Sequence, residues 1–175
     1  LPQKEVMEWV SKRYYSFNSI IRALHNKKEG LKDNLKFEIL KHNLPSNEVL
    51  LIGGGESVLS HLEALVIYLK NKPEITIIHA SSKNAKPFIG LKNKQIFCLV
   101  GNEGHRLEDV FKGYSGFKGI CVLPPYPREM GTYVPLSVEN QTFELEEVTF
   151  TKLEIFSHTS LALQIALNFG ATNIM

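Results

Sequence analysis

Three consecutive glycines, Gly53 to Gly55, are the residues whose spacing most directly suggests chemistry. They separate an apolar run from an amphipathic helical pattern, and such a turn lets the backbone approach a pyrophosphate. Gly53 and Gly55 match the first two positions of the dinucleotide pattern G-x-G-x-x-G, but Val58 occupies the third. No Gly-Lys-Ser/Thr follows, so the turn is not a P-loop. Two interpretations stay open: a site for a nucleotide or other phosphorylated ligand, or a purely structural turn.

The two residues after the glycines point in different directions. The carboxylate of Glu56 repels a phosphate, although it can accept hydrogen bonds from ribose hydroxyls. Ser57 is a natural N-cap for the helix, because its short side chain accepts from free amides of the first turn. We include both residues in the candidate site.

Two further segments follow apolar runs and are expected at the same edge of the sheet, and a third, HTS at residues 158–160, opens the last helix, where His158 could contact an anion. The segment GNEGHR, residues 101–106, carries Arg106, whose guanidinium can meet a phosphate with two donors. The segment PPYPRE, residues 124–129, is stiff and extended. Each also has a simpler explanation: a solvated turn, a rigid connector, or a helix start capped by Thr159. The ligand-binding candidates are Gly53, Gly54, Gly55, Glu56, Ser57, Asn102, His105, Arg106, Tyr126, Arg128 and His158.

Metal-binding and nucleophile motifs are not found in the sequence. The six histidines are isolated from one another, without a His-x-His, H-E-x-x-H or Cys-x-x-Cys pair. There is no G-x-S-x-G elbow. The acidic run Glu144, Glu146 and Glu147 fits the exposed face of a strand or loop better than a catalytic acid and base. We therefore predict no metal site and name no catalytic residue.

Short apolar runs alternate with helical patterns over the last three quarters of the chain. Strands buried on both faces are expected at residues 49–52, 75–79, 95–100 and 119–123. Helices are expected at 58–69, 106–112 and 159–168, the last ended by Gly170, with a further strand starting at 171. This alternation predicts an α/β fold: a Rossmann-like, mostly parallel sheet with helices on both faces.

The first 44 residues follow a different pattern. Apolar residues recur at helical spacing over 3–12 and 17–24, and a further short helix is expected at 34–43. The turn-forming residues 45–47 mark a boundary. We therefore predict a helical linker or docking segment at 1–44 and a Rossmann-like domain at 45–175.

Composition narrows the choice of partners and compartment. The 175 residues carry 20 Lys and Arg against 18 Asp and Glu, so no bulk charge recruits nucleic acid or an acidic membrane. No apolar stretch is long enough for a transmembrane helix. Cys98 and Cys121 each lie inside an apolar run and are expected to be free, buried thiols, which favours the reducing cytoplasm. The chain opens on Leu1-Pro2 and closes on what looks like the start of a strand, so we expect a fragment of a longer protein.

One resemblance concerns the first part of the chain. The stretch KEVMEWVSKRYYSFNSIIRALHNK, followed by a linker and LLIGGGESV, resembles the region after the barrel in bacterial aldolases related to 4-hydroxy-2-oxovalerate aldolase and the hydroxymethylglutaryl-CoA lyase family. The resemblance implies an accessory C-terminal domain of a lyase. The divalent metal of that family would lie in the N-terminal TIM barrel, so no cofactor is expected in this chain. Implied partners are that barrel, a small phosphorylated ligand or a second copy of the chain.

A second resemblance covers residues 49–175. The segments GGGESV and TSLALQIALNFGATNIM are similar to the glycine turn and late helix–strand unit of bacterial sialyltransferases and of proteins like 6-hydroxymethylpterin diphosphokinase. In those groups the turn lies at a nucleotide site, which implies the same for Gly53, Gly54, Gly55 and Ser57. This sequence has Glu56 where those groups have proline. The resemblance implies the alternative function, a nucleotide-dependent glycosyl- or diphosphotransferase.

Overall fold

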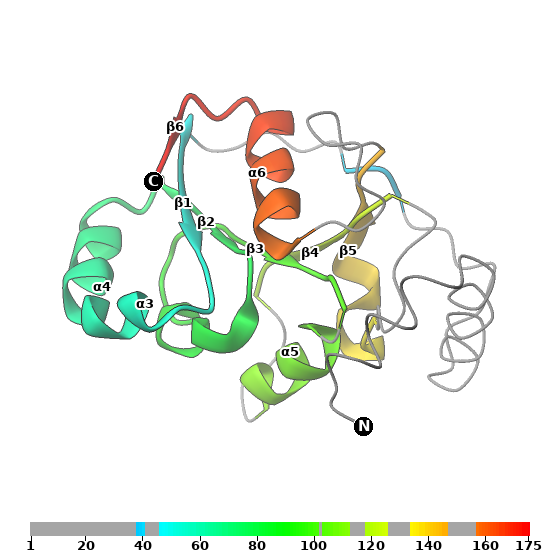
Figure 1. Cartoon of the computed structure of the whole chain (residues 1–175), viewed down its shortest axis with the longest axis horizontal. Helices are drawn as coiled ribbons and strands as arrows, with labels where there is room; N and C mark the ends of the chain where they lie inside the picture. The colour runs from blue at the N-terminus through cyan, green and yellow to red at the C-terminus, as the bar shows by residue number, and fades with distance from the viewer. Residues whose placement is uncertain (1–37, 41–45, 102, 113–117, 126–133, 147–156) are drawn as a thin grey trace, which may run out of the picture.

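The computed structural model describes residues 38–40, 46–101, 103–112, 118–125, 134–146 and 157–175. Its centre is a six-stranded sheet with the order β5-β4-β3-β2-β1-β6, and every neighbouring pair is parallel (Figure 1). The α/β prediction is thus confirmed. The strands are β1 (Glu48–Ile52), β2 (Thr76–His79), β3 (Gln95–Cys98), β4 (Ile120–Leu123), β5 (Thr142–Glu144) and β6 (Asn173–Ile174).

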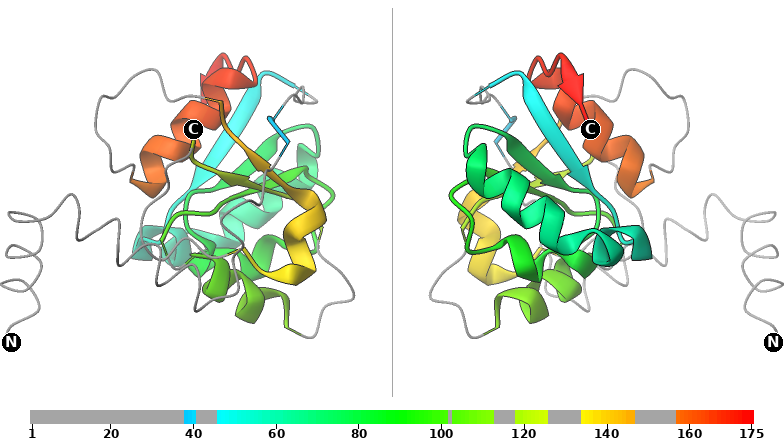
Figure 2. Two further views of the ribbon diagram at one scale, coloured as in Figure 1. Left: turned by 90° about the vertical axis from the view of Figure 1, so that its right-hand side faces the viewer. Right: turned by 90° about the vertical axis from the view of Figure 1, so that its left-hand side faces the viewer.

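Helices cover both faces of the sheet, which explains why its strands are continuous apolar runs. On one face, Val49, Ile78 and Ile96 pack with α6 (His158–Asn168). On the other face, alternate strand residues pack beneath α4 (Leu62–Asn71) and α5 (Glu103–Phe111). Figure 2 shows α6 separated from α4 and α5 by the sheet. The sheet therefore has an apolar core on each face, between its strands and the covering helices.

Successive strands are added to one side of β1 until β5, and the last strand is then added to the other side of β1, so the order of the strands reverses beside β1. Strands β1 to β5 follow one another across the sheet, and α6 then carries the chain back to β6, on the other side of β1. This order differs from that of the dinucleotide-binding Rossmann fold, in which three strands lie on either side of the reversal. In open α/β sheets, ligands bind outside the carboxyl ends of the strands at such a reversal. The glycine turn follows β1 and so lies at that position.

The helix after the glycine turn differs in detail from its prediction. It is split into α3 (Glu56–Ser60) and α4, because His61 adopts φ −114° and ψ 15°, outside the helical region. Gly55 is the N-cap of α3 and no side chain caps it, so the assignment of Ser57 as N-cap was wrong. The helix α6 follows its prediction to within one residue, and Gly170 has the left-handed φ of +74° expected after it. The helix α5 begins three residues before its predicted start at 106.

Residues 38–40 contradict the helix expected at 34–43. They form a parallel bridge with β5, in which Leu40 N donates to Glu144 O and Glu144 N donates to Glu38 O, both at 3.0 Å. The physical reason is that an edge strand has unpaired amides and carbonyls, which an extended segment satisfies. The three-residue strand β5 was itself not predicted. The remainder of the predicted helical segment 1–44 lies outside the described residues.

Gly119, at the start of β4, is required by the backbone. Its φ is +151°, and a Cβ there would lie 2.6 Å from the carbonyl oxygen of Gln95 in the neighbouring strand. We expect Gly119→Ala to lower the free energy of unfolding by about 2 kcal/mol. Urea denaturation measures this, with Gly90→Ala as the control because no atom lies within 4 Å of its Cβ position. Equal stability of the two variants would contradict the prediction.

Candidate functional site

The turns after β1 and β2 are joined to each other at the carboxyl edge of the sheet. Asn84 lies in the short helix η1 (Ser82–Asn84) that follows β2. Its Nδ2 donates to Gly53 O at 3.1 Å and to Gly55 O at 2.9 Å. The side chain of Asn84, which the sequence analysis did not select, therefore holds the backbone of the glycine turn in place.

A buried carboxylate joins the turn after β2 to the turn after β3. Glu103 is the first residue of α5, and only 1% of it is exposed. Its Oε2 accepts from Ser82 N at 2.8 Å and Ser82 Oγ at 2.5 Å, and its Oε1 accepts from Ser81 Oγ at 3.1 Å. Such a carboxylate fixes the position of two loops at once, because each donor comes from a segment distant in sequence from α5.

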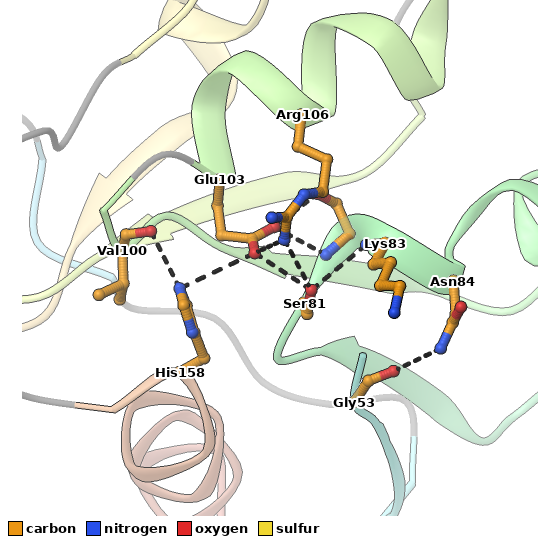
Figure 3. Close-up of polar contacts among 9 residues, drawn as sticks. Gly53, Ser81, Lys83, Asn84, Val100, Glu103, Arg106 and His158 are labelled. Atoms are coloured by element: carbon orange, nitrogen blue, oxygen red, sulfur yellow. Dashed lines mark hydrogen bonds and ion pairs between the residues drawn. The ribbon is translucent and has the colours of Figure 1, made fainter. Parts of the chain in front are cut away.

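Arg106 lies on the solvent side of this carboxylate. Its Nη1 is 2.5 Å from Glu103 Oε1 and 3.2 Å from Ser81 Oγ. The side chain of Arg106 is 39% exposed, so the guanidinium is anchored at one nitrogen and still reaches solvent (Figure 3). A guanidinium has five N–H donors. Arg106 can therefore bind an anion while it remains paired with Glu103.

His158, the first residue of α6, comes to the same carboxylate from the other face. Its Nε2 is 3.1 Å from Val100 O and 3.8 Å from Glu103 Oε1, and the side chain is 41% exposed. Because a carbonyl oxygen can only accept, Nε2 carries a hydrogen, and in the neutral ring Nδ1 then has the lone pair. The cap of α6 is Ser157, whose Oγ accepts from Ser160 N, and not Thr159.

The three glycines differ in what surrounds them. None has a positive φ, so the backbone conformation does not require glycine at any of the three positions. A Cβ on Gly54 would lie 3.3 Å from Ser81 Oγ and 3.6 Å from Lys83 Cδ, whereas a Cβ on Gly53 meets nothing within 4 Å. Gly54 is thus explained by packing against the next loop, and open space lies beside Gly53.

The structure brings together only part of the predicted site. Gly53, Arg106 and His158 lie at the carboxyl ends of β1 to β3 (Figure 3), and Gly54 and Gly55 lie beside Ser81 and Asn84. Glu56, Ser57 and His105 are exposed on α3 and α5. Three candidates lie outside the described residues: Asn102, Tyr126 and Arg128.

The sequence analysis missed the loop after β2 and the role of Glu103. Ser81, Ser82, Lys83 and Asn84 form a polar run directly after a predicted strand. The same signal selected residues 101–106, so it could have selected this run as well. Glu103 lay inside a quoted segment, but nothing local marks a carboxylate that will be buried.

The two thiols contribute no nucleophile to the site. Burial raises the pKa of Cys98 well above its ordinary value, and the negative charge of Glu103 raises it further. Burial also raises the pKa of Cys121. A thiol with a raised pKa stays protonated and unreactive near neutral pH. Both cysteines are free, as predicted.

The described residues contain neither a metal-binding cluster nor a membrane-spanning helix. In these, no three His, Cys, Asp or Glu side chains are grouped so that they could hold a metal ion. Within the same residues, no helix has the length and apolar character needed to cross a membrane.

Comparison of the chain with protein-family models, with curated proteins and with solved structures gives no match.

Proposed function

We propose that this chain binds a small phosphorylated ligand of the nucleotide class at the carboxyl edge of its Rossmann-like sheet. One observation supports this most: Arg106 and the glycine turn both approach Ser81, and Arg106 and His158 both lie beside Glu103, at the carboxyl edge of the sheet. Arg106 supplies charge-assisted donors for a phosphate, and the open space beside Gly53 admits a phosphate close to the backbone. Exposed Glu56 favours a ligand that also carries hydroxyl donors, such as a ribose.

In the parent protein, this binding domain would be the accessory C-terminal unit of an aldolase. The proposal rests on the resemblance of residues 4–27 and 50–58 to the region after the barrel in that family. The domain would then bind a ligand or contact the barrel or a second copy of the chain, while the aldol chemistry belongs to the barrel. Reading the parent gene upstream of Leu1 tests this part, because a barrel sequence with a His-x-His pair is expected there.

The binding proposal is tested by titration with CMP, a nucleotide sugar, ATP and coenzyme A. We expect at least one of these to raise the melting temperature of the chain, since a ligand that binds only the folded state stabilises it. Gly53→Ala is expected to be as stable as the unsubstituted chain. It should bind that ligand at least tenfold more weakly, because its methyl group enters the open space.

Two controls make the titration decisive. Gly90→Ala adds the same methyl group at another position where no atom lies within 4 Å, and it should bind the ligand with the affinity of the unsubstituted chain. Gly54→Val is unsuitable as the binding test, because its side chain would collide with Ser81 and disturb folding. The absence of any shift with all four ligands would exclude the nucleotide proposal for these classes, and unchanged binding by Gly53→Ala would remove the glycine turn from the site.

A second function, that of a nucleotide-dependent transferase, is favoured by the hydrogen bond of His158. With Nε2–H directed at Val100 O and the Glu103 carboxylate beside it, Nδ1 is left as a base on a half-exposed ring. Such a base would take the proton of an acceptor hydroxyl as the hydroxyl oxygen attacks the phosphorylated donor, whose bond to the nucleotide breaks so that the nucleotide leaves. With water as the acceptor, the chain should then release nucleotide slowly from the donor that binds, and His158→Gln should lose this turnover by a much larger factor than it loses binding. Equal turnover by His158→Gln would leave only the binding function.

A further inference from the structure

A cavity lies at the amino edge of the sheet, opposite the edge that carries the glycine turn. Its volume is about 380 Å³, within the range of roughly 300–1,000 Å³ typical of small-molecule sites. It opens where β3 and β4 begin, whereas the glycine turn follows the end of β1. The cavity is lined by Leu91, Lys92, Asn93, Lys94, Gln95, Lys118, Gly119 and Ile120.

The described charged residues that line this cavity have one sign. Lys92, Lys94 and Lys118 line it, and among the lining residues that the structure describes there is no Asp or Glu. Lys92 and Lys118 are exposed, while Lys94 is half-buried with its ammonium 5.6 Å from the centre of the Phe169 ring. Burial lowers the pKa of Lys94, because its ammonium is partly removed from water. An anion beside Lys94 would stabilise the charged form of its side chain.

The wall of the cavity is fixed by buried amides. Asn93 and Gln95 are 5% and 3% exposed. Asn93 Nδ2 donates to Lys72 O at 2.9 Å and to Ile75 O at 3.0 Å, and Gln95 Nε2 donates to Phe88 O at 2.7 Å. These bonds tie the segment that carries Lys92 and Lys94 to the core. The cavity is therefore a built feature of the fold, and its lysines project from a rigid support.

We propose that this amino-edge cavity binds a small multivalent oxyanion, a compound with two or more phosphate or carboxylate charges. Leu91 and Ile120 add apolar surface for the carbon skeleton of such a compound, and the three lysines provide the charge. A lysine ammonium on its flexible side chain can bind an oxyanion from several directions, whereas an arginine guanidinium favours a planar, bidentate geometry. The site is separate from the proposed nucleotide site, so each can be tested without the other.

The test uses pyrophosphate and citrate as probes, with sodium chloride of equal ionic strength as the reference. In ¹⁵N NMR titrations we expect saturable shifts at the amides of Asn93, Lys94 and Gly119. Calorimetry should give at least tenfold weaker binding for Lys94→Gln/Lys118→Gln, and no change for Lys70→Gln, which removes an exposed charge from α4. Preference for pyrophosphate would identify a phosphorylated ligand, and preference for citrate a carboxylate.

Three results would overturn the proposal. The first is that neither probe gives a saturable shift. The second is that Lys70→Gln weakens binding as much as the double variant, which would mean that only net charge matters. The third is that the shifts appear at Gly53 to Gly55 in place of Gly119, which would assign the anion to the carboxyl edge. The double variant leaves the carboxyl edge intact, so its effect is separate from any failure of the nucleotide site.

Discussion

Replacement of Glu103 by alanine is expected to lower the free energy of unfolding by about 4 kcal/mol. The carboxylate is almost fully buried and accepts from Ser81 and Ser82, so its removal leaves buried donors without a partner. Arg106 contributes less to this loss, because its side chain is 39% exposed and water can replace the carboxylate there. Urea denaturation at pH 7 measures the change.

Two variants separate the contacts of Glu103 from its charge alone. Glu103→Gln keeps the shape but places an NH2 donor against the donors of either Ser82 or Arg106, and a loss of about 2 kcal/mol is expected. Asp109→Asn removes an exposed carboxylate from the same helix and should change stability by less than about 0.5 kcal/mol. If Glu103→Ala lost less than about 1 kcal/mol, the carboxylate would not be holding the two loops together.

Acidification is expected to destabilise the domain through His79. Burial lowers its pKa from 6.5 to about 4, partly offset by the hydrogen bond from Nε2 to Gln95 Oε1 at 2.9 Å. Well above pH 6.5 the ring is neutral in the folded and unfolded chain, and it adds no pH dependence. Below that value the unfolded chain binds the proton first, so stability falls by about 2 kcal/mol at pH 5 and about 3 kcal/mol at pH 4.

His79→Gln is the variant that isolates this effect. The glutamine does not titrate, and its Nε2 can take the place of the histidine Nε2 as donor to Gln95. Its side chain would occupy the position that the His79 ring now fills, stacked 4.5 Å from the ring of Phe97. The difference in stability between pH 7.5 and pH 5 should be about 2 kcal/mol smaller for His79→Gln than for the parent chain. Equal pH dependence of the two proteins would show that His79 does not titrate in the way its burial implies.

The amino-acid sequence by itself determined the strands and most of the helices. A strand buried on both faces must be a continuous apolar run, and this local pattern is visible without any knowledge of the neighbouring strands. The sequence also placed the polar turns, because residues directly after a parallel strand reach the carboxyl edge. It failed at β5 and at residues 38–40, where short segments are extended only because each supplies the other's hydrogen bonds.

Only the tertiary structure decided how the candidate site is held together. Glu103 is bound by Ser82, 21 residues earlier in the chain, and no local pattern predicts a contact between such distant residues. The surroundings of the glycines also depend on the tertiary structure. Gly54 lies close to Ser81 of the next loop, and open space that a ligand could fill lies beside Gly53. Local pattern thus fixed which elements form, and long-range packing fixed which side chains meet at their ends, because hydrogen bonds and burial depend on partners brought close by the fold.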